Sequence, residues 1–385
     1  MTTIIKAADA AQFLGLVPHL LGFRPTRSMV LVPFAGSRSL GAMRIDLEPQ
    51  PAREGSAEPA VILEPPGETV DRLAATAIGM VCRIASADAV AVVIYTDETI
   101  VGGCLPREQL ARAVARRADA CGIELRDALC VAGNGWASYL DPERPADGRP
   151  LDLLHSDEHA ERLLPLGDGD QHSGARLPTV DPARLAEVTT AVEALTGALG
   201  TNGTTSLGAH VDPRALHSLQ ELDDVTQLLE RMIEWDAATA APFEMAVAVL
   251  CLSRPALRDI ALLQWSGSVS DGVTALEAQL RWEDGEPYPE ELGTRVWGQG
   301  PGPDPERLES ALQLARHCAA LTSGVRRATV LGMCAWLSWA QGRSTEAGDY
   351  AAEACASGAE MPLAEVVLAF VNTAHLPDWA FQRAA

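Results

Sequence analysis

Hydrophobic and polar positions in the first 140 residues alternate in the manner of a sheet. Residues 28–34 (SMVLVPF) and 90–95 (VAVVIY) are short, continuous apolar runs, which are typical of buried strands. Residues 42–47 (AMRIDL) alternate between apolar and polar positions, and the short loop before them predicts a hairpin with the first run. Residues 124–131 predict a further strand, and residues 136–140 predict a last, shorter one.

Two amphipathic helices are predicted between these strands. The first covers residues 69–84, and the second begins at Pro106 with Ala118 and Cys121 on its inward face. The resulting order, β-β-α-β-α-β, favours an α/β layered domain with a mixed sheet.

Beyond residue 179 the apolar spacing changes to three and four, as in helices. Leu185, Val188, Val192, Leu195 and Leu199 form one such stripe. Asp-Pro pairs at 181–182, 212–213 and 304–305 predict helix starts. Further helical stretches are predicted over residues 216–233, 243–252, 254–265, 308–321, 325–341, 345–357 and 363–372.

These patterns predict a domain organisation of three parts. Residues 1–140 form the α/β domain, residues 141–179 a linker or long loop, and residues 180–385 an all-α domain. The last domain is acidic: residues 1–150 carry 15 basic and 18 acidic side chains, whereas residues 151–385 carry 15 and 34. A net charge of −22 disfavours binding to nucleic acid or to anionic membranes, so we expect neither partner.

Cysteine and histidine spacing bears on compartment and cofactors. None of the eight cysteines forms a C-x-x-C pair, which argues against zinc knuckles and favours a reduced, cytoplasmic protein. The first 20 residues lack the pattern of a signal peptide. His155 and His159 are four residues apart, but their surroundings favour a solvated loop over a metal site. We therefore expect no metal and no cofactor.

Two groups of motifs resemble a known family. The first is Leu20-Leu21-Gly22-Phe23-x-Pro25-x-x-Ser28, followed by Arg44-Ile45-Asp46-Leu47. The second comprises residues 258–263 (RDIALL) and 335–339 (AWLSW), then Gly342. This order resembles the actinobacterial family known as domain of unknown function 4192, over residues 13–379. The resemblance implies the fold and supplies no activity. Residues 135–140 replace the Arg-Trp-Trp-Ser run and cysteine pair typical of such proteins.

Candidate ligand-binding residues gather around the predicted hairpin and one strand end. Arg24, Arg27 and Arg44, with Arg38 nearby, could form an anion pocket, or Arg44 could pair with Asp46. Asp97 follows the strand of residues 90–95, where α/β sheets usually bind ligands, although an aspartate is also common in turns.

Signatures of known catalytic classes are missing from the sequence. Residues 97–106 contain neither a Walker motif nor G-x-G-x-x-G, the chain has no G-x-S-x-G elbow, and Cys104 has no neighbouring base. No catalytic residue is therefore nominated, and whether the protein is an enzyme stays open.

Two functions compete on these observations. The first is a non-enzymatic protein-interaction or regulatory module that binds a protein partner through its acidic helical region. The alternative is a domain that binds a small anion or nucleotide-like ligand, or an enzyme, at the strand ends near Asp97.

Overall fold

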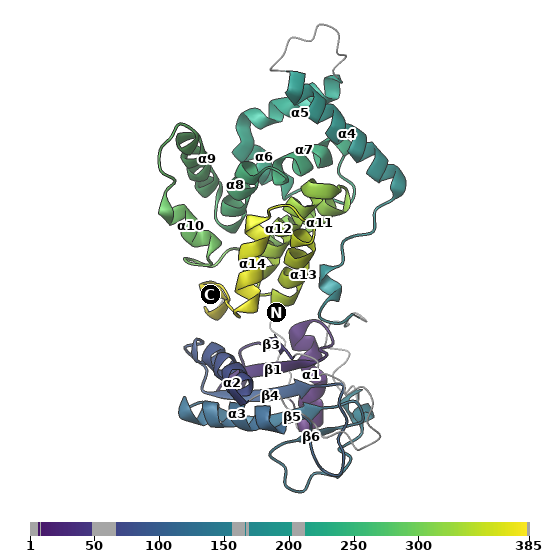
Figure 1. Cartoon of the computed structure of the whole chain (residues 1–385), viewed down its shortest axis with the longest axis vertical. Coiled ribbons are helices and arrows are strands. Elements are labelled where there is room, and N and C mark those ends of the chain that lie inside the picture. The colour runs from purple at the N-terminus through teal and green to yellow at the C-terminus, as the bar shows by residue number, and fades with distance from the viewer. Residues whose placement is uncertain are drawn as a thin grey trace. The chain divides into compact units, whose positions relative to one another are not determined.

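The chain divides into two compact units, Met1–Gln171 and His172–Ala385, here called the α/β unit and the helical unit (Figure 1). The computed structural model describes residues 7, 9–47, 67–155, 166, 169–201 and 212–382. An α/β region with a mixed sheet followed by an all-helical region confirms the predicted fold class. The predicted limits of the linker, residues 141 and 179, stay a prediction.

The α/β unit is built on a six-stranded sheet. Its order is β2-β1-β4-β5-β6, and β3 also pairs with β1, which confirms the predicted hairpin. Among the strand pairs of the described residues, only β4 and β5 run parallel, so the sheet is mixed. The strands are β1 (Ser28–Ala35), β2 (Arg38–Ser39), β3 (Met43–Asp46), β4 (Ala89–Tyr95), β5 (Glu124–Val131) and β6 (Trp136–Ser138).

Helices cover both faces of this sheet. Leu14 and Val17 of α1 (Ala10–Leu21) pack against Val30 and Val93 on one face. Alternate strand positions such as Leu31 point to the other face and are equally buried. There α2 (Gly67–Cys82) and α3 (Glu108–Ala120) lie side by side (Figure 1). The sheet therefore forms the middle layer of three.

Helix α1 was not predicted from the sequence. Pro18 lies inside this helix. Because a proline lacks the N–H that a helix interior uses, its presence argues against a helix in the sequence. The ends of α1 carry clear signals nevertheless. The Asp9 side chain accepts a hydrogen bond from the Gln12 N–H, and Gly22 closes the helix with a φ of 82°.

The helical unit contains eleven α-helices among its described residues. The three Asp-Pro pairs stand at the starts of α4, α5 and α11, as predicted. The single helix predicted over residues 216–233 is split in two by a turn of 3-10 helix, Glu221–Asp224. The helices are α4 (Pro182–Thr201), α5 (Pro213–Gln220), α6 (Val225–Met232), α7 (Pro242–Leu252), α8 (Pro255–Ser266), α9 (Val269–Glu283), α10 (Glu290–Val296), α11 (Pro305–Ala320), α12 (Gly324–Ala340), α13 (Ser344–Cys355) and α14 (Pro362–Asn372).

Helix α12 forms the centre of the helical core. From Ala328 to Ala340 each of its residues is buried, and α11, α13 and α14 pack around it (Figure 1). Trp339 contacts the rings of Trp336, Phe370 and Trp379, and its indole N–H donates to the His375 carbonyl at 2.7 Å. Among the described residues, no helix has the length and apolar character needed to cross a membrane.

Candidate functional site

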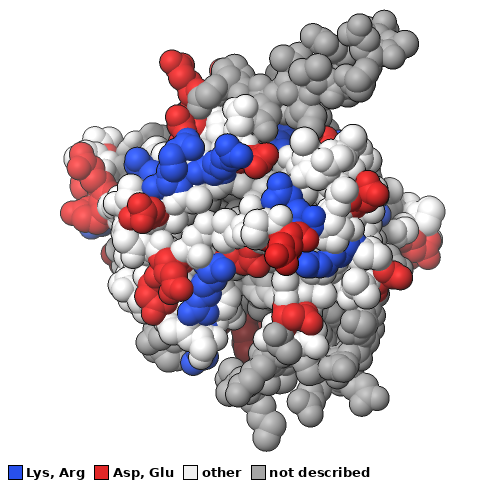
Figure 2. Space-filling view, turned by 90° about the horizontal axis from the view of Figure 1, so that it is seen from below, with Lys and Arg blue, Asp and Glu red and all other residues white. Residues whose placement is uncertain are grey.

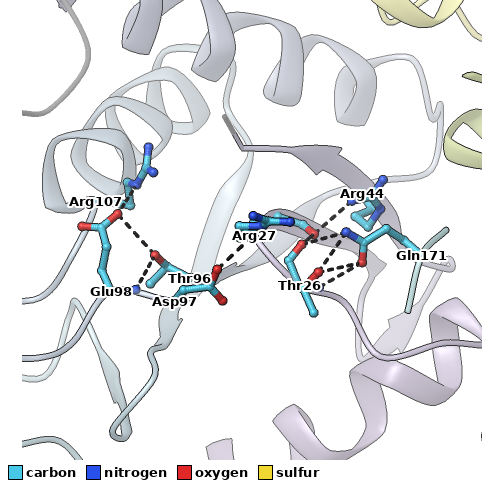
Figure 3. A network of polar contacts seen from close by, with 9 residues as sticks. Thr26, Arg27, Arg44, Thr96, Asp97, Glu98, Arg107 and Gln171 are labelled. Carbon is cyan, nitrogen blue, oxygen red and sulfur yellow. Dashed lines mark hydrogen bonds and ion pairs between the residues drawn. The ribbon is translucent and has the colours of Figure 1, made fainter. Parts of the chain in front are cut away.

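The antiparallel pairing of β1 with β4 brings two predicted site residues together. Ser28 at the start of β1 lies opposite Tyr95 at the end of β4. Arg27 and Asp97, which lie just outside these strands, therefore meet, with 3.7 Å between the arginine Nε and the aspartate Oδ2 (Figure 3). Both side chains are more than half exposed, so this ion pair is open to solvent.

Arg44 lies in the same network but is engaged by the sheet itself. Its guanidinium donates to both carboxylate oxygens of Asp46, at 2.7 and 2.9 Å, and to the Ser28 hydroxyl at 3.0 Å. The Arg44 side chain is only 6% exposed. The geometry thus matches the pairing alternative for Arg44, in which its fork of donors binds a neighbouring carboxylate.

Arg24 and Arg38 lie outside these ion pairs. Arg24 is exposed, and its backbone N–H donates to the Gly169 carbonyl at 3.3 Å. Arg38 lies in β2 opposite Ala35, at the other end of β1 from Ser28. Of the four arginines around the hairpin, Arg38 is therefore at the far end of β1, and the two side-chain ion pairs described above involve Arg27 and Arg44.

A buried glutamine closes this edge from far along the chain. Gln171 is 3% exposed, and its side-chain amide makes four hydrogen bonds to Thr26, two to its backbone and two to its hydroxyl, at 3.0–3.1 Å (Figure 3). The segment before Arg27 is consequently held in place by a residue 145 positions later.

Sequence reasoning missed a second ion pair at the end of β4. Glu98 accepts a hydrogen bond from Arg107 Nε at 2.8 Å, and the Arg107 side chain is 9% exposed. The Thr96 hydroxyl contacts the same carboxylate at 3.3 Å. Glu98 follows β4 and Arg107 precedes α3, so the two meet because the chain turns back between these elements. The spacing of residues in the sequence does not predict this ion pair.

Both arginines beside the β4 end have unusual backbone conformations. Arg27 has a φ of 40° and Arg107 a φ of 61°, in the left-handed region that non-glycine residues rarely adopt. Such conformations persist only where surrounding contacts impose them, and they concentrate at functional sites. Gly133 approaches the same loop closely, because a Cβ there would stand 3.0 Å from the Asp97 carbonyl.

One polar group at this strand end lacks a partner. The Tyr95 hydroxyl is buried and makes no hydrogen bond within the described part of the chain. It lies among apolar side chains that include Leu14, Val17 and Val30. Burial raises the pKa of Tyr95 well above its ordinary value, so the group stays a neutral hydrogen-bond donor.

The remaining residues singled out in the sequence have structural surroundings. Cys104 is exposed and ends a turn that Gly102 and Gly103 form with positive φ. Residues 136–139 are held by the fold, since the Trp136 indole donates to the Pro150 carbonyl and the Tyr139 hydroxyl to that of Pro106.

No metal-binding group could be assembled from the described residues. Among them, no three His, Cys, Asp or Glu side chains are placed to hold an ion. His159 lies outside the described residues.

A different kind of surface belongs to α9, α10 and the connection between them, residues 269–297, here called the α9–α10 segment. It carries all three large aromatic side chains that are exposed within the described chain: Trp282 at 54%, Trp297 at 53% and Tyr288 at 36%. Val273 and Leu280 of α9 are also exposed. Neither helix was predicted from the sequence.

Charge around these aromatic residues is strongly acidic. The α9–α10 segment contains seven acidic and two basic residues. In contrast, acidic and basic side chains are interspersed over the face that Figure 2 shows. The segment therefore combines exposed apolar area with a negative surround.

The α/β unit and the first half of the helical unit carry a recognisable family signature. A model of the family described as Domain of unknown function (DUF4192) matches residues 11–282. The chain belongs to this family. No curated protein and no solved structure matches it.

The DUF4192 match has a definite extent along the fold. It begins in α1, includes the whole sheet with Arg27, Asp97, Glu98 and Arg107, and ends in α9 at Trp282. The expected resemblance extended further, to residue 379. The matched residues therefore include the strand-end network and one of the three exposed aromatic residues, Trp282.

Proposed function

We propose that this protein is a non-enzymatic protein-interaction module whose α9–α10 segment binds the partner. The observation that carries the proposal is the confinement of the exposed large aromatic residues, among those described, to residues 282–297. Tryptophan and tyrosine dominate binding energy at protein interfaces, because they bury large areas with few rotatable bonds. The cysteine spacing supports a cytoplasmic location, which forms part of this proposal.

The acidic surround defines the chemistry of the partner. Exposed carboxylates of Glu283, Asp284, Glu286, Glu290 and Glu291 border the aromatic residues along the chain. Complementary charge speeds association and excludes wrong partners. The partner should therefore present an apolar segment flanked by lysine or arginine side chains.

Capture from native lysate by the tagged full chain, compared with the double variant Trp282→Ala/Trp297→Ala, tests this function. We expect the double variant to retain less than about a tenth of the wild-type partner, since aromatic hot spots contribute about 2 kcal/mol or more each. Binding should also weaken as salt rises, because opposite charges attract the partner.

Leu185→Ala provides the matched control, since Leu185 is exposed on α4 outside the segment. It should capture as much as wild type. Equal capture by wild type and the double variant would contradict the proposal.

The strand-end network supports a second candidate, a site for a small anion. Its basis is Arg27 beside the end of β4, which has a left-handed backbone conformation and is exposed and only loosely paired with Asp97. An anion would displace Asp97 from Arg27 and bind the freed guanidinium.

Thermal unfolding with and without inorganic phosphate tests this second candidate. A ligand at 100 times its Kd stabilises by about 2.7 kcal/mol, and Arg27→Ala should abolish that gain. Stabilisation that survives Arg27→Ala would place the anion elsewhere.

A further inference from the structure

Cys82 and Cys121 lie 39 positions apart in sequence and next to each other in the structure. Cys82 is the last residue of α2, and Cys121 caps the end of α3. The two helices pack side by side and lead into β4 and β5, which run parallel, so their C-terminal ends lie together. The Cys121 thiol is close enough to that of Cys82 to raise its pKa, and both residues are exposed.

The exposure of Cys121 corrects the sequence prediction, which placed this residue on the inward face of its helix. Helix α3 ends at Ala120, so Cys121 no longer follows the helical period and its side chain reaches the surface. An isolated surface thiol would carry little meaning. A second exposed thiol beside it changes the available chemistry.

We propose that Cys82 and Cys121 form a redox-active dithiol that closes to a disulfide under peroxide. One thiolate attacks a peroxide oxygen, which breaks the O–O bond and leaves a sulfenic acid and one water. The second thiol then attacks the sulfenic sulfur, forms the S–S bond and releases another water. Two thiols are oxidised by two electrons, and one hydrogen peroxide is reduced to two waters.

The surroundings of the two thiols affect the rate of this reaction through the pKa of Cys82. Partial burial and contact with Cys121 raise the pKa of Cys82, whereas the nearby Arg117 guanidinium opposes this rise. Since the thiolate is the reactive form, closure should accelerate as pH rises from neutral toward about 9.

The other cysteines differ in ways that make the pair specific. Burial raises the pKa of Cys130 to about 11 and those of Cys251 and Cys334 to about 12, so these thiols stay protonated and inaccessible. Cys104 is the third exposed cysteine. Cys82 and Cys121, the other two, are neighbours of each other.

A disulfide between Cys82 and Cys121 would restrain the part of the chain that carries the strand-end network. The loop it closes, residues 82–121, contains β4, the Asp97 and Glu98 carboxylates and Arg107. The crosslink would therefore fasten the two helix ends on one face of the sheet and restrict the chain that carries the strand-end network.

Peptide mapping of the full chain tests the proposal directly. The folded protein is treated with hydrogen peroxide, free thiols are blocked with N-ethylmaleimide, and the chain is digested with trypsin. We expect a crosslink between residues 73–83 and residues 118–126, lighter by two hydrogens than the two peptides together and lost on reduction with dithiothreitol. The peptide of residues 84–107, which contains Cys104, should stay alkylated.

Variants separate this outcome from non-specific oxidation. Cys82→Ser and Cys121→Ser should each abolish the crosslink, whereas Cys104→Ser, a change at another exposed thiol, should leave its yield unchanged. All three exposed cysteines remaining open to alkylation in oxidised wild type would overturn the proposal. So would crosslinks that mainly join two chains or involve Cys104.

Discussion

The sheet edge of the α/β unit and the α9–α10 segment of the helical unit handle charge in opposite ways. At the sheet edge of the α/β unit, arginines pair with carboxylates of the same unit: Arg27 with Asp97, Arg44 with Asp46 and Arg107 with Glu98. The α9–α10 segment instead carries seven acidic residues and two basic ones. A surface that neutralises its own charges has little left for a macromolecular partner, whereas an unbalanced one with exposed aromatic residues retains that capacity.

The units also differ in what holds them together. The sheet depends on pairing between distant strands and on polar contacts such as that of Gln171 with Thr26. The helical unit depends on aromatic packing around α12, where Trp339 is fully buried. Substitutions around α12 should therefore act through lost packing, and substitutions at the sheet edge through lost polar contacts.

The largest effect is expected from Trp339→Ala in the helical core. The change leaves a large cavity and removes the hydrogen bond to the His375 carbonyl, which should lower the free energy of unfolding by about 3–5 kcal/mol. Urea denaturation followed by tryptophan fluorescence measures it, because seven of the eight tryptophans lie after residue 171. The exposed Trp282→Ala should change stability little, and an equal loss in both variants would refute the distinction.

A smaller loss is expected for Arg44→Ala in the sheet. Removing this guanidinium leaves Asp46 and Ser28 without its charge-assisted hydrogen bonds, for a loss of about 1.5–3 kcal/mol. Far-UV circular dichroism during urea denaturation reports it. Unchanged stability would show that these hydrogen bonds contribute nothing to the free energy of unfolding.

In the helical unit, Glu230 should make stability depend on pH. Hydrogen bonds from Arg307 and Gln264 lower its pKa in the folded state. A lowered folded pKa stabilises above the unfolded value, about 4.3, and this contribution disappears as pH falls through the folded pKa.

Glu230→Gln should accordingly cost about 1 kcal/mol at pH 7, and this cost should shrink as pH falls through the folded pKa of Glu230. Urea denaturation at pH 7, 5 and 3 measures this convergence with wild type. A constant difference at every pH would show that hydrogen-bond geometry, and not charge, is responsible.

The smallest effect is expected for Arg27→Ala. Its ion pair with Asp97 is long and exposed, so the change should alter stability by about 0–1 kcal/mol. Thermal unfolding at low and high salt measures it. A loss as large as that of Arg44→Ala would show that both arginines stabilise the sheet equally.

Local periodicity was sufficient to predict the sheet and most of the helices. The run at residues 90–95 predicted a strand covered on both faces, and every residue of β4 is buried. The ends of helices were predicted less well. Cys121 was expected on the inward face of α3, but the helix ends at Ala120 and Cys121 is exposed. Helix α1 escaped because Pro18 lies inside it, and α9 and α10 because charged and turn-forming residues interrupt their apolar pattern.

The candidate site was only partly accessible to sequence reasoning. Arg27, Arg44 and Asp97 were nominated because they flank predicted strands, and pairing of β1 with β4 brings Arg27 to Asp97. Arg107 and Gln171 were missed, since their contacts join segments whose proximity depends on the folded chain. The roles of Arg24, Arg27, Arg44 and Asp97 in ligand binding stay predictions.

The bond between Thr26 and Gln171 also affects the order in which the protein can fold during synthesis. The two residues are 145 positions apart, so the sheet edge stays unfinished until nearly half the chain has left the ribosome. Contacts of such long sequence separation slow folding, because a large loop must close before they form. The helices that follow pack mainly on their chain neighbours and can assemble as they emerge. Completion of the first unit and assembly of the second therefore overlap in time.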